Sequence, residues 1–328
     1  MQIAITGSIA TDHLMTFDGL FAESLVVEQL DKISLSFLTE DLQVRRGGVA
    51  ANIAFGMANL GQRPILVGAV GEDFTDYRSW LERHGVDCAS VHYSDSQHTA
   101  RFICTTDRDM AQIATFYAGA MTEARDIELG PVADRVGGLD LVVVGPNDPE
   151  AMLRHSDECR TRGIPFAADP SQQLAFMDGS SIRRLIDGAE YLFTNEYESH
   201  LASQKTGWSE DEMASRVRVQ VKTRGKDGAT IRVRGEKPVE IAAARETHRT
   251  DPTGVGDAFR AGFLTGAAAG LDALLSAELG SMLATYVLET VGTQEYTLRR
   301  SEFLDRLAEA YGDESAEAIA RHITIALP

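Results

Sequence analysis

Residues 251–259 have the sequence Asp251-Pro252-Thr253-Gly254-Val255-Gly256-Asp257-Ala258-Phe259. Small and apolar residues follow at helical spacing, so this stretch predicts a loop that leads into the N-terminus of a buried helix. Unpaired backbone N–H groups and the positive end of the helix dipole lie at such a terminus. Because Gly254 and Gly256 lack Cβ atoms, an anion can approach these N–H groups closely.

Asp257 stands beside this predicted anion site, where its carboxylate would repel a bound anion. We interpret it as a general base, which removes the proton from a hydroxyl group while that group attacks a phosphoryl group. The alternative is an ordinary helix cap, because aspartate commonly caps helix N-termini. The sequence contains no G-x-x-x-x-G-K-[ST] motif, so a P-loop is not available for the same chemistry.

Length and charge set the class of protein. The 328 residues suffice for one large α/β domain, and the net charge of −18 argues against nucleic acid or an anionic membrane as a partner. The N-terminus lacks the features of a signal peptide, and no segment approaches the roughly 18 apolar residues of a membrane span. The three cysteines, Cys88, Cys104 and Cys159, have no paired or metal-like spacing, which favours buried thiols and a cytoplasmic location.

Strand-like and helix-like segments alternate over most of the chain. Strands are predicted at 2–6, 65–70, 139–145, 164–169, 191–194, 217–223 and 229–233, and helices at 49–60, 148–163, 274–291, 300–311 and 314–322. Such alternation indicates an α/β fold with a mostly parallel sheet and helices on both of its faces. We therefore predict a single domain over residues 1–328.

A small β lid is expected to interrupt this pattern. Segments 98–105 and 110–117 flank a polar turn and predict two antiparallel strands, and a further short strand is expected near 34–38. With these segments, the lid would comprise about 12–45 and 95–120, and it would lie across the active site or a second copy of the protein. We expect Phe102, Gln112 and Phe116 to point inward, with the two rings around a planar ligand. The alternative is that both rings belong to the core of the lid itself.

Polar residues follow several of the predicted strands. Ser8 follows the first strand, Asp12 is expected on the loop after it, and Gly48 and Asn52 lie at the start of a helix. Further polar residues follow the later strands: Gln172, Gln173, Asn195, Glu198, Thr223 and Gly225. Because the carboxyl ends of parallel strands share one edge, these residues predict a single cleft. Asp12 could instead stabilise a turn, and Gly48 could serve only tight packing between helix and sheet.

Four segments together resemble the ribokinase family, also called the PfkB carbohydrate kinases. They are Arg46-Gly47-Gly48-x-Ala50-x-Asn52, Asn195-x-x-Glu198, Thr223-x-Gly225-x-x-Gly228 and Asp251-x-Thr253-Gly254-x-Gly256-Asp257. The resemblance spans nearly the whole chain. Within the family, residues 6–14, 148–152 and 168–174 are similar to the adenosine kinases of mycobacteria and related actinobacteria.

The resemblance implies an ATP-dependent kinase of a ribokinase-like fold, which phosphorylates the 5′-hydroxyl group of adenosine in purine salvage. Asp257 would be the base, and the amides of Gly254, Val255 and Gly256 would stabilise the transferring γ-phosphoryl group. The residues implied along ATP are Gln112, Asn195, Thr223, Gly225, Lys226, Asp227, Gly228 and Gly256. Glu198 would organise Mg²⁺ through water, and a requirement for K⁺ stays open.

The substrate side follows from the same resemblance. The residues implied at the nucleoside are Ser8, Asp12, Ser36, Gly48 and Asn52 around the ribose, Phe102 and Phe116 flanking the base, and Gln172 and Gln173 at its polar edge. A homodimer through the lid is also implied. The alternatives are a kinase of a free sugar, such as ribose or fructose, or of another nucleoside. A nucleoside-binding protein without catalysis is disfavoured by Asp257. A nucleosidase is disfavoured because the sequence shows neither the metal cage nor the phosphate-dependent site that such an enzyme would need.

Overall fold

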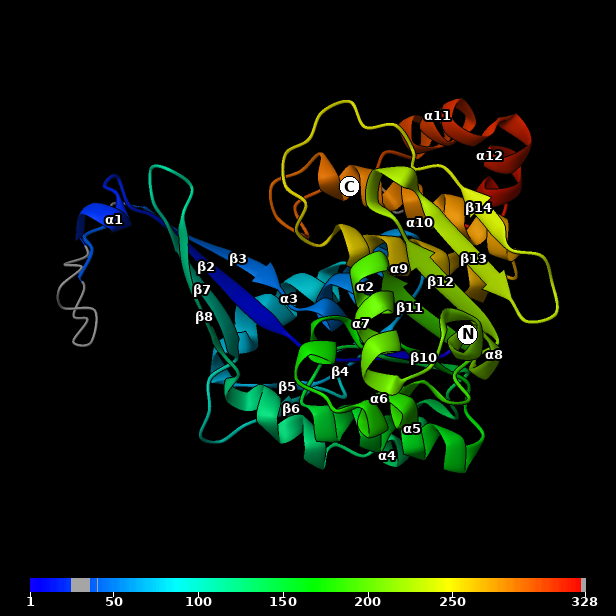
Figure 1. Cartoon of the computed structure of the whole chain (residues 1–328), viewed down its shortest axis with the longest axis horizontal. Coiled ribbons are helices and arrows are strands. Elements are labelled where there is room, and N and C mark those ends of the chain that lie inside the picture. The colour runs from blue at the N-terminus through cyan, green and yellow to red at the C-terminus, as the bar shows by residue number, and fades with distance from the viewer. Residues whose placement is uncertain (25–35, 40, 326–328) are drawn as a thin grey trace.

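A central sheet organises the fold of this protein, whose computed structural model describes residues 1–24, 36–39 and 41–325 (Figure 1). Its eight strands have the order β14-β13-β12-β11-β10-β9-β1-β4. Their bounds are β1 Ile3–Thr6, β4 Ile65–Val67, β9 Leu141–Val144, β10 Phe166–Ala168, β11 Tyr191–Asn195, β12 Val219–Thr223, β13 Ala229–Val233 and β14 Val239–Ile241. From β4 to β12 all neighbours are parallel, and β13 and β14 add an antiparallel edge. The mostly parallel sheet is confirmed.

Helices cover both faces of this sheet. In Figure 1, α4, α5 and α6 lie below the sheet, and α9 to α12 lie above it. The helix bounds are α2 Val49–Asn59, α3 Thr75–Arg83, α4 Leu129–Val136, α5 Pro149–Arg162, α6 Gly179–Ile186, α7 Glu196–Thr206, α8 Glu210–Arg216, α9 Val255–Ala268, α10 Ala273–Leu288, α11 Arg300–Tyr311 and α12 Asp313–Ala320. None of the helices in the described residues is long and apolar enough to cross a membrane.

Alternation along the buried strands explains the two layers. Ile3 and Ile5 of β1 belong to the apolar cluster with α2, α9 and α10, whereas Ala4 belongs to the cluster on the opposite face. Val143 and Val142 of β9 divide in the same way. Successive side chains of a strand point to opposite faces, so a continuous apolar run requires a cover on each face.

A separate four-stranded sheet forms the lid and projects from the body at the left of Figure 1. Its order is β3-β2-β7-β8, with β2 Ala10–Thr16, β3 Asp41–Gly47, β7 Ala100–Thr106 and β8 Gln112–Tyr117. The predicted antiparallel pair is confirmed as β7 and β8, with Phe102 opposite Phe116. Asp12 lies within β2 rather than on a loop. Of the strand expected near 34–38, residues 34 and 35 lie outside the described residues, and 36–38 have no strand structure.

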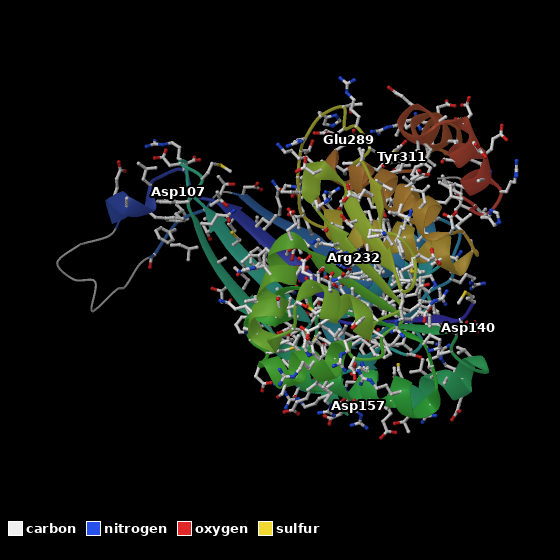
Figure 2. All side chains as sticks on the ribbon, turned by 45° about the vertical axis from the view of Figure 1, so that its right-hand side comes forward. Asp107, Asp140, Asp157, Arg232, Glu289 and Tyr311 are labelled. Atoms are coloured by element: carbon white, nitrogen blue, oxygen red, sulfur yellow. The ribbon has the colours of Figure 1, made fainter. Side chains whose placement is uncertain are left out.

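The outer end of the lid is held by Asp107, which Figure 2 labels at that end. Its carboxylate accepts hydrogen bonds from the backbone N–H groups of Phe21 at 3.0 Å, Asp109 at 3.0 Å and Ala111 at 2.9 Å. These bonds lower the pKa of Asp107. They join the turn between β7 and β8 to the short helix α1, Phe21–Ser24, which follows β2. The lid is therefore tied together at the end that is farther from the body.

The strand predicted over 65–70 is divided in the structure. Ile65–Val67 is β4 of the main sheet, and Ala69–Val70 is β5, which pairs with β6, His92–Tyr93. The division falls at Gly68, where a Cβ atom would lie 2.8 Å from the carbonyl oxygen of Gly7. This close approach brings the backbone after β1 against the strand, at the edge where the polar residues gather.

Candidate active site

A pocket of about 450 Å³ lies where the lid meets the carboxyl ends of the strands. Its lining comprises Ser8, Ala10, Asp12, Gly48, Val49, Asn52, Phe102, Phe116, Met121, Pro146, Gln172, Gln173, Phe176, Thr253, Gly254, Asp257 and Thr293. The structure thus brings the predicted base together with every predicted substrate residue except Ser36. A larger surface hollow, of about 840 Å³, lies over α5, but its arginines pair with neighbouring carboxylates, as Arg154 does with Glu158.

The loop before α9 has the predicted form. Gly254 is the N-cap residue, with φ of +78°, and a Cβ atom there would lie 2.7 Å from Cγ2 of Thr293. Asp251 orders the loop by accepting hydrogen bonds from the N–H groups of Thr253 at 2.9 Å and Gly292 at 3.1 Å. The first turn of α9 therefore directs its unpaired N–H groups beside the pocket that Asp257 lines.

Asp257 lies in the first turn of α9, and its Oδ2 accepts a hydrogen bond of 2.8 Å from Nδ2 of Asn52. Burial raises the pKa of Asp257 to about 6, and the charge of Glu198 adds to this effect. Arg260 and the Asn52 amide oppose it because they favour the ionised carboxylate. Near neutral pH the carboxylate is therefore ionised and still basic enough to accept a proton.

Asp12 reaches the pocket from the lid. Burial, together with the smaller effects of the negative charges of Asp251, Asp257 and Glu295, raises its pKa to about 6. Ser8 lines the same pocket and accepts a hydrogen bond of 3.1 Å from the N–H group of Val49. Carboxylate and hydroxyl oxygens at this mouth suit a ligand with several hydroxyl groups.

Gly48 has a packing role in addition to its place in the pocket. Its φ is +91°, and a Cβ atom would lie 2.6 Å from both the amide nitrogen of Ala10 and the carbonyl oxygen of Ser8. A residue with a side chain cannot occupy this position without moving the backbone. Packing alone therefore explains why this position is glycine, and contact with a ligand stays a prediction.

Most of the residues predicted along the nucleotide lie farther along the same sheet edge. Asn195, which ends β11, pairs with Thr223 of β12. Gly225, Lys226 and Asp227 form a short 3₁₀ turn after β12, and Gly228 follows with φ of +85°. A Cβ atom at Gly228 would overlap the carbonyl oxygen of Ile241, so this glycine is also required by packing.

The Asn195-x-x-Glu198 segment is a capping box. Asn195 Oδ1 accepts from the N–H group of Glu198, and Glu198 Oε2 accepts from that of Asn195, both at 2.8 Å. Such a pair satisfies two free donors at the start of α7. The motif therefore has a structural role whatever else it binds.

The next question is which carboxylates of this site could hold Mg²⁺. The described residues contain no group of three or more His, Cys, Asp or Glu side chains that could hold a metal. They therefore do not form a protein cage for it. Mg²⁺ usually binds through one or two carboxylates, several waters and substrate phosphates. Glu198, whose Oε2 also lies 3.9 Å from Arg260, fits such a limited role.

Two predicted contacts are not supported by the structure. Gln112 lies at the outer end of β8, opposite Thr106, and its Nε2 donates to Thr106 Oγ1 at 3.3 Å. It shares the face of Phe116, but it lies four positions away along the strand, which is roughly 13 Å. Ser36 is exposed and, in the described chain, does not line the pocket. Alternation predicts the correct face of a strand, but it does not predict the distance along it.

Several residues at the site were not predicted. Arg260, one turn after Asp257, forms a buried ion pair with Asp169, with two N–O distances of 2.6 Å. Phe176 joins the aromatic wall of the pocket, and Thr293 and Gln294 contact Asn52. Arg260 could have been predicted as a site residue, because it lies one turn after Asp257 in the same helix. Thr293 and Gln294 lie after α10, far along the chain, and no local pattern indicated that they lie close to Asn52.

Comparison with known proteins agrees with this arrangement. Residues 17–299 match the model of the pfkB family carbohydrate kinases. The chain belongs to this family. Its ribokinase-like fold is also that of a solved ribokinase from Arabidopsis thaliana, with a TM-score of 0.77 at 19% identity over 93% of this chain and 98% of the other.

Other pfkB relatives are more similar. A nucleoside kinase of Methanothermobacter thermautotrophicus is 33% identical, over 82% of this chain and 86% of that protein. A nucleoside kinase of Burkholderia thailandensis, solved in complex with inosine, is 38% identical, with a TM-score of 0.82 over 94% of this chain and 98% of the other. These are archaeal and Burkholderia proteins, so the likeness to actinobacterial adenosine kinases stays a prediction.

Proposed function

We propose that this pfkB protein is an ATP-dependent nucleoside kinase, which transfers the γ-phosphoryl group of ATP to a nucleoside 5′-hydroxyl group. One observation carries the proposal. The same pocket contains the Asp257 carboxylate at the N-terminus of α9 and two aromatic residues, Phe102 and Phe116, which are cross-strand neighbours on one face of the lid. The first group suits proton removal beside a phosphoryl group, and the second suits a flat heteroaromatic base.

The chemical step needs few groups from the protein. Asp257 accepts the proton of the 5′-hydroxyl group as its oxygen attacks phosphorus. The N–H groups of Gly254, Val255 and Gly256 stabilise the negative charge of the transferring group. Because phosphoryl transfer depends mainly on position and charge, one base and a helix N-terminus suffice.

The nucleobase lies against the lid in this proposal. Phe102 and Phe116 line one wall of the pocket, and Phe176, which is 80% exposed, lines it from the body. Gln173 donates its Nε2 to the carbonyl oxygen of Asn147 at 2.7 Å, so its own carbonyl oxygen remains as an acceptor. That oxygen can accept from the amino group of adenosine or from the ring N–H of inosine.

We propose adenosine as the first acceptor, on the resemblance to adenosine kinases, with inosine as the second. The inosine complex of the Burkholderia thailandensis relative supports the second choice. A free sugar remains the alternative, but it would leave the rings of Phe102, Phe116 and Phe176 without a partner in the pocket.

ATP would lie along Asn195, Thr223 and the turn from Gly225 to Gly228, with Lys226 near its phosphates. Mg²⁺ would arrive with ATP and neutralise phosphate charge, with Glu198 acting through water. Asn195 and Glu198 keep the start of α7 rigid for this purpose. A K⁺ requirement is left to experiment.

We also propose a homodimer through the outer face of the lid and a location in the cytoplasm. Leu42 and Val44 of β3 and Ile113 of β8 are 56%, 57% and 45% exposed, and such apolar strands are commonly covered by a partner. The three cysteines are free and buried, which agrees with a reducing compartment.

The proposal is tested by offering the purified protein ATP with adenosine, inosine, guanosine, ribose or fructose, and by measuring ADP. We expect nucleosides to support faster ADP formation than either sugar. ADP formation with the sugars alone, or nucleoside binding without ADP formation, would overturn the proposal.

A further inference from the structure

The Asn52 side chain is the centre of a buried network under the pocket. Asn52 is 7% exposed, and its Nδ2 donates to Asp257 Oδ2 at 2.8 Å. Its Oδ1 accepts from two donors, Thr293 Oγ1 at 2.8 Å and Gln294 Nε2 at 2.9 Å. A carbonyl oxygen has two lone pairs, so these two donors saturate it.

The donors fix which way the Asn52 amide points. A flipped amide would place its NH₂ group against the NH₂ group of Gln294, and its oxygen against the carboxylate of Asp257. Both contacts would be repulsive in a site with little water. The observed orientation leaves one N–H of Asn52 for a ligand oxygen, because the other is held by Asp257.

Gln294 is itself held in one direction. It is 0% exposed, and its Nε2 donates to the hydroxyl oxygen of Tyr77 at 2.6 Å as well as to Asn52. Tyr77 in turn donates its proton to the carbonyl oxygen of Gly47 at 2.9 Å. Burial raises the pKa of Tyr77, so its hydroxyl group keeps that proton.

This orientation of the Gln294 amide leaves its oxygen without a hydrogen bond. Gln294 Oε1 is buried and has no hydrogen-bond partner within the described residues. A buried acceptor without a partner is unfavourable, so stability alone does not explain a glutamine at this position. Its two donated hydrogen bonds, directed at Asn52 and Tyr77, are what the residue contributes.

We propose that Gln294 is a positioning residue for Asp257, and that it acts by fixing the Asn52 amide so that Nδ2 faces the carboxylate. The role rests on the proposed kinase function, in which Asp257 removes the proton from the acceptor hydroxyl group. Gln294 contacts neither substrate nor phosphate in this role. It determines the direction and the basicity of the carboxylate through one intermediate side chain.

Thr293 is the second donor to Asn52, and its hydroxyl group also lies near the lid. Its single hydroxyl proton lies within reach of two acceptors, Asn52 Oδ1 at 2.8 Å and the carbonyl oxygen of Arg46 at 3.0 Å. Arg46 belongs to β3, a strand of the lid. Thr293 therefore shares its donor between Asn52 and the lid strand directly, whereas Gln294 reaches that strand only through Tyr77, which donates to the carbonyl oxygen of Gly47.

The main test replaces Gln294 with methionine, which has a similar length but no donor. With Asn52 free to rotate, Asp257 loses a hydrogen bond to its ionised form, and its pKa rises. We expect Gln294→Met to lower kcat at pH 7.5 by roughly tenfold or more, with a smaller change in the KM for ATP. The acidic limb of the kcat profile should move to higher pH, and a purely structural role would not produce that shift.

A matched pair at Thr293 supports the test. Thr293→Val keeps the shape but removes the hydroxyl group, and Thr293→Ser keeps the hydroxyl group. We expect the valine variant to show a weaker form of the Gln294→Met effect and the serine variant to retain most of the wild-type kcat. If Gln294→Met does not fold, as judged by thermal unfolding, this pair decides the question through the same pH profile.

Two failures can be told apart. If the wild-type protein phosphorylates no nucleoside, the proposed function fails, and the variants are then compared on the acceptor that it does use. If the wild type is active and Gln294→Met folds with an unchanged kcat and an unchanged acidic limb, the positioning role of Gln294 is wrong while the kinase function stands. Equal losses in the valine and serine variants would also contradict the network.

Discussion

The two walls of the pocket differ in how firmly they are held. On the body side, Asp257 lies in α9, and the residues behind it are buried: Arg260 is 8% exposed, Asn52 7% and Gln294 0%. On the lid side, Phe116 of β8 is 51% exposed, and β3, at the other edge of the lid sheet, exposes Leu42 and Val44. Groups that must keep fixed distances thus belong to the core, and groups that need only cover a flat ligand belong to an exposed sheet.

This contrast assigns different tasks to the two walls. A base must lie within hydrogen-bond reach of its proton, so small displacements are costly in rate. Aromatic contact tolerates displacement and contributes mainly through the area covered. We therefore expect changes in the body to affect kcat for every acceptor, and changes in the lid to affect which acceptor is bound.

The largest effect is expected for Asp257→Asn. The amide keeps the shape of the side chain but cannot accept the proton, so kcat should fall by about 10²–10⁴-fold. Steady-state rates with each acceptor measure the loss, and calorimetry checks that ATP still binds. A folded variant with near-normal turnover would show that Asp257 is not the base.

A smaller loss is expected for Gly254→Ala. The added Cβ atom would meet Cγ2 of Thr293 at 2.7 Å, and the residue would have to keep φ of +78°. A shift of α9 by about 1 Å could cost roughly 10²-fold in kcat. Gly270→Ala is the matched control, because Gly270 has φ of +81° but no described atom lies within 4 Å of its Cβ position. Equal kcat losses in both variants would contradict the steric explanation.

The pH dependence tests the body in the wild-type protein. The working form of Asp257 is the carboxylate, and its pKa of about 6 lies above the ordinary value. The ratio kcat/KM should therefore be level above about pH 7 and fall about tenfold per unit below pH 6. If Asp12, with a pKa of about 6, must also be ionised, the fall becomes steeper. An acidic limb with its midpoint near pH 4 would show that burial does not raise these pKa values.

The smallest effect is expected in the lid. Phe102→Ala should raise the KM for a nucleoside by about tenfold and leave the KM for ribose nearly unchanged, because only the base contacts the ring. Phe17→Ala is the control, since Phe17 packs on Phe21 at a ring distance of 5.7 Å at the outer end of the lid. Equal losses for nucleoside and ribose in Phe102→Ala would make Phe102 part of the core of the lid.

Local patterns predicted most of the fold. Apolar runs gave the parallel strands, and the glycines at Gly48 and Gly254 marked the starts of α2 and α9 correctly. Interruption of the strand at Gly68 was missed because it depends on a backbone contact with Gly7, which no local pattern records. The position of Asp12 within β2 was missed for a similar reason, since its partners Arg45 and Phe102 lie far away in sequence.

The site was predictable where residues belong to motifs and not where they join distant segments. Motif residues such as Asp257, Asn52 and Gln173 meet in one pocket as expected. Gln112 shares the predicted face of β8 but lies too far along it. Gln294 is 242 residues from Asn52 in the chain, so only the folded structure brings the two side chains together.

The most direct test of the division between body and lid is a competition measurement. Adenosine and ribose are offered together at equal concentration with ATP, and the two phosphorylated products are quantified by phosphorus NMR for the wild type and for Phe102→Ala. We predict that nucleoside 5′-phosphate predominates in the wild type and that its excess over ribose phosphate falls about tenfold in the variant. Predominance of ribose phosphate in the wild type, or an unchanged product ratio in the variant, would contradict the assignment.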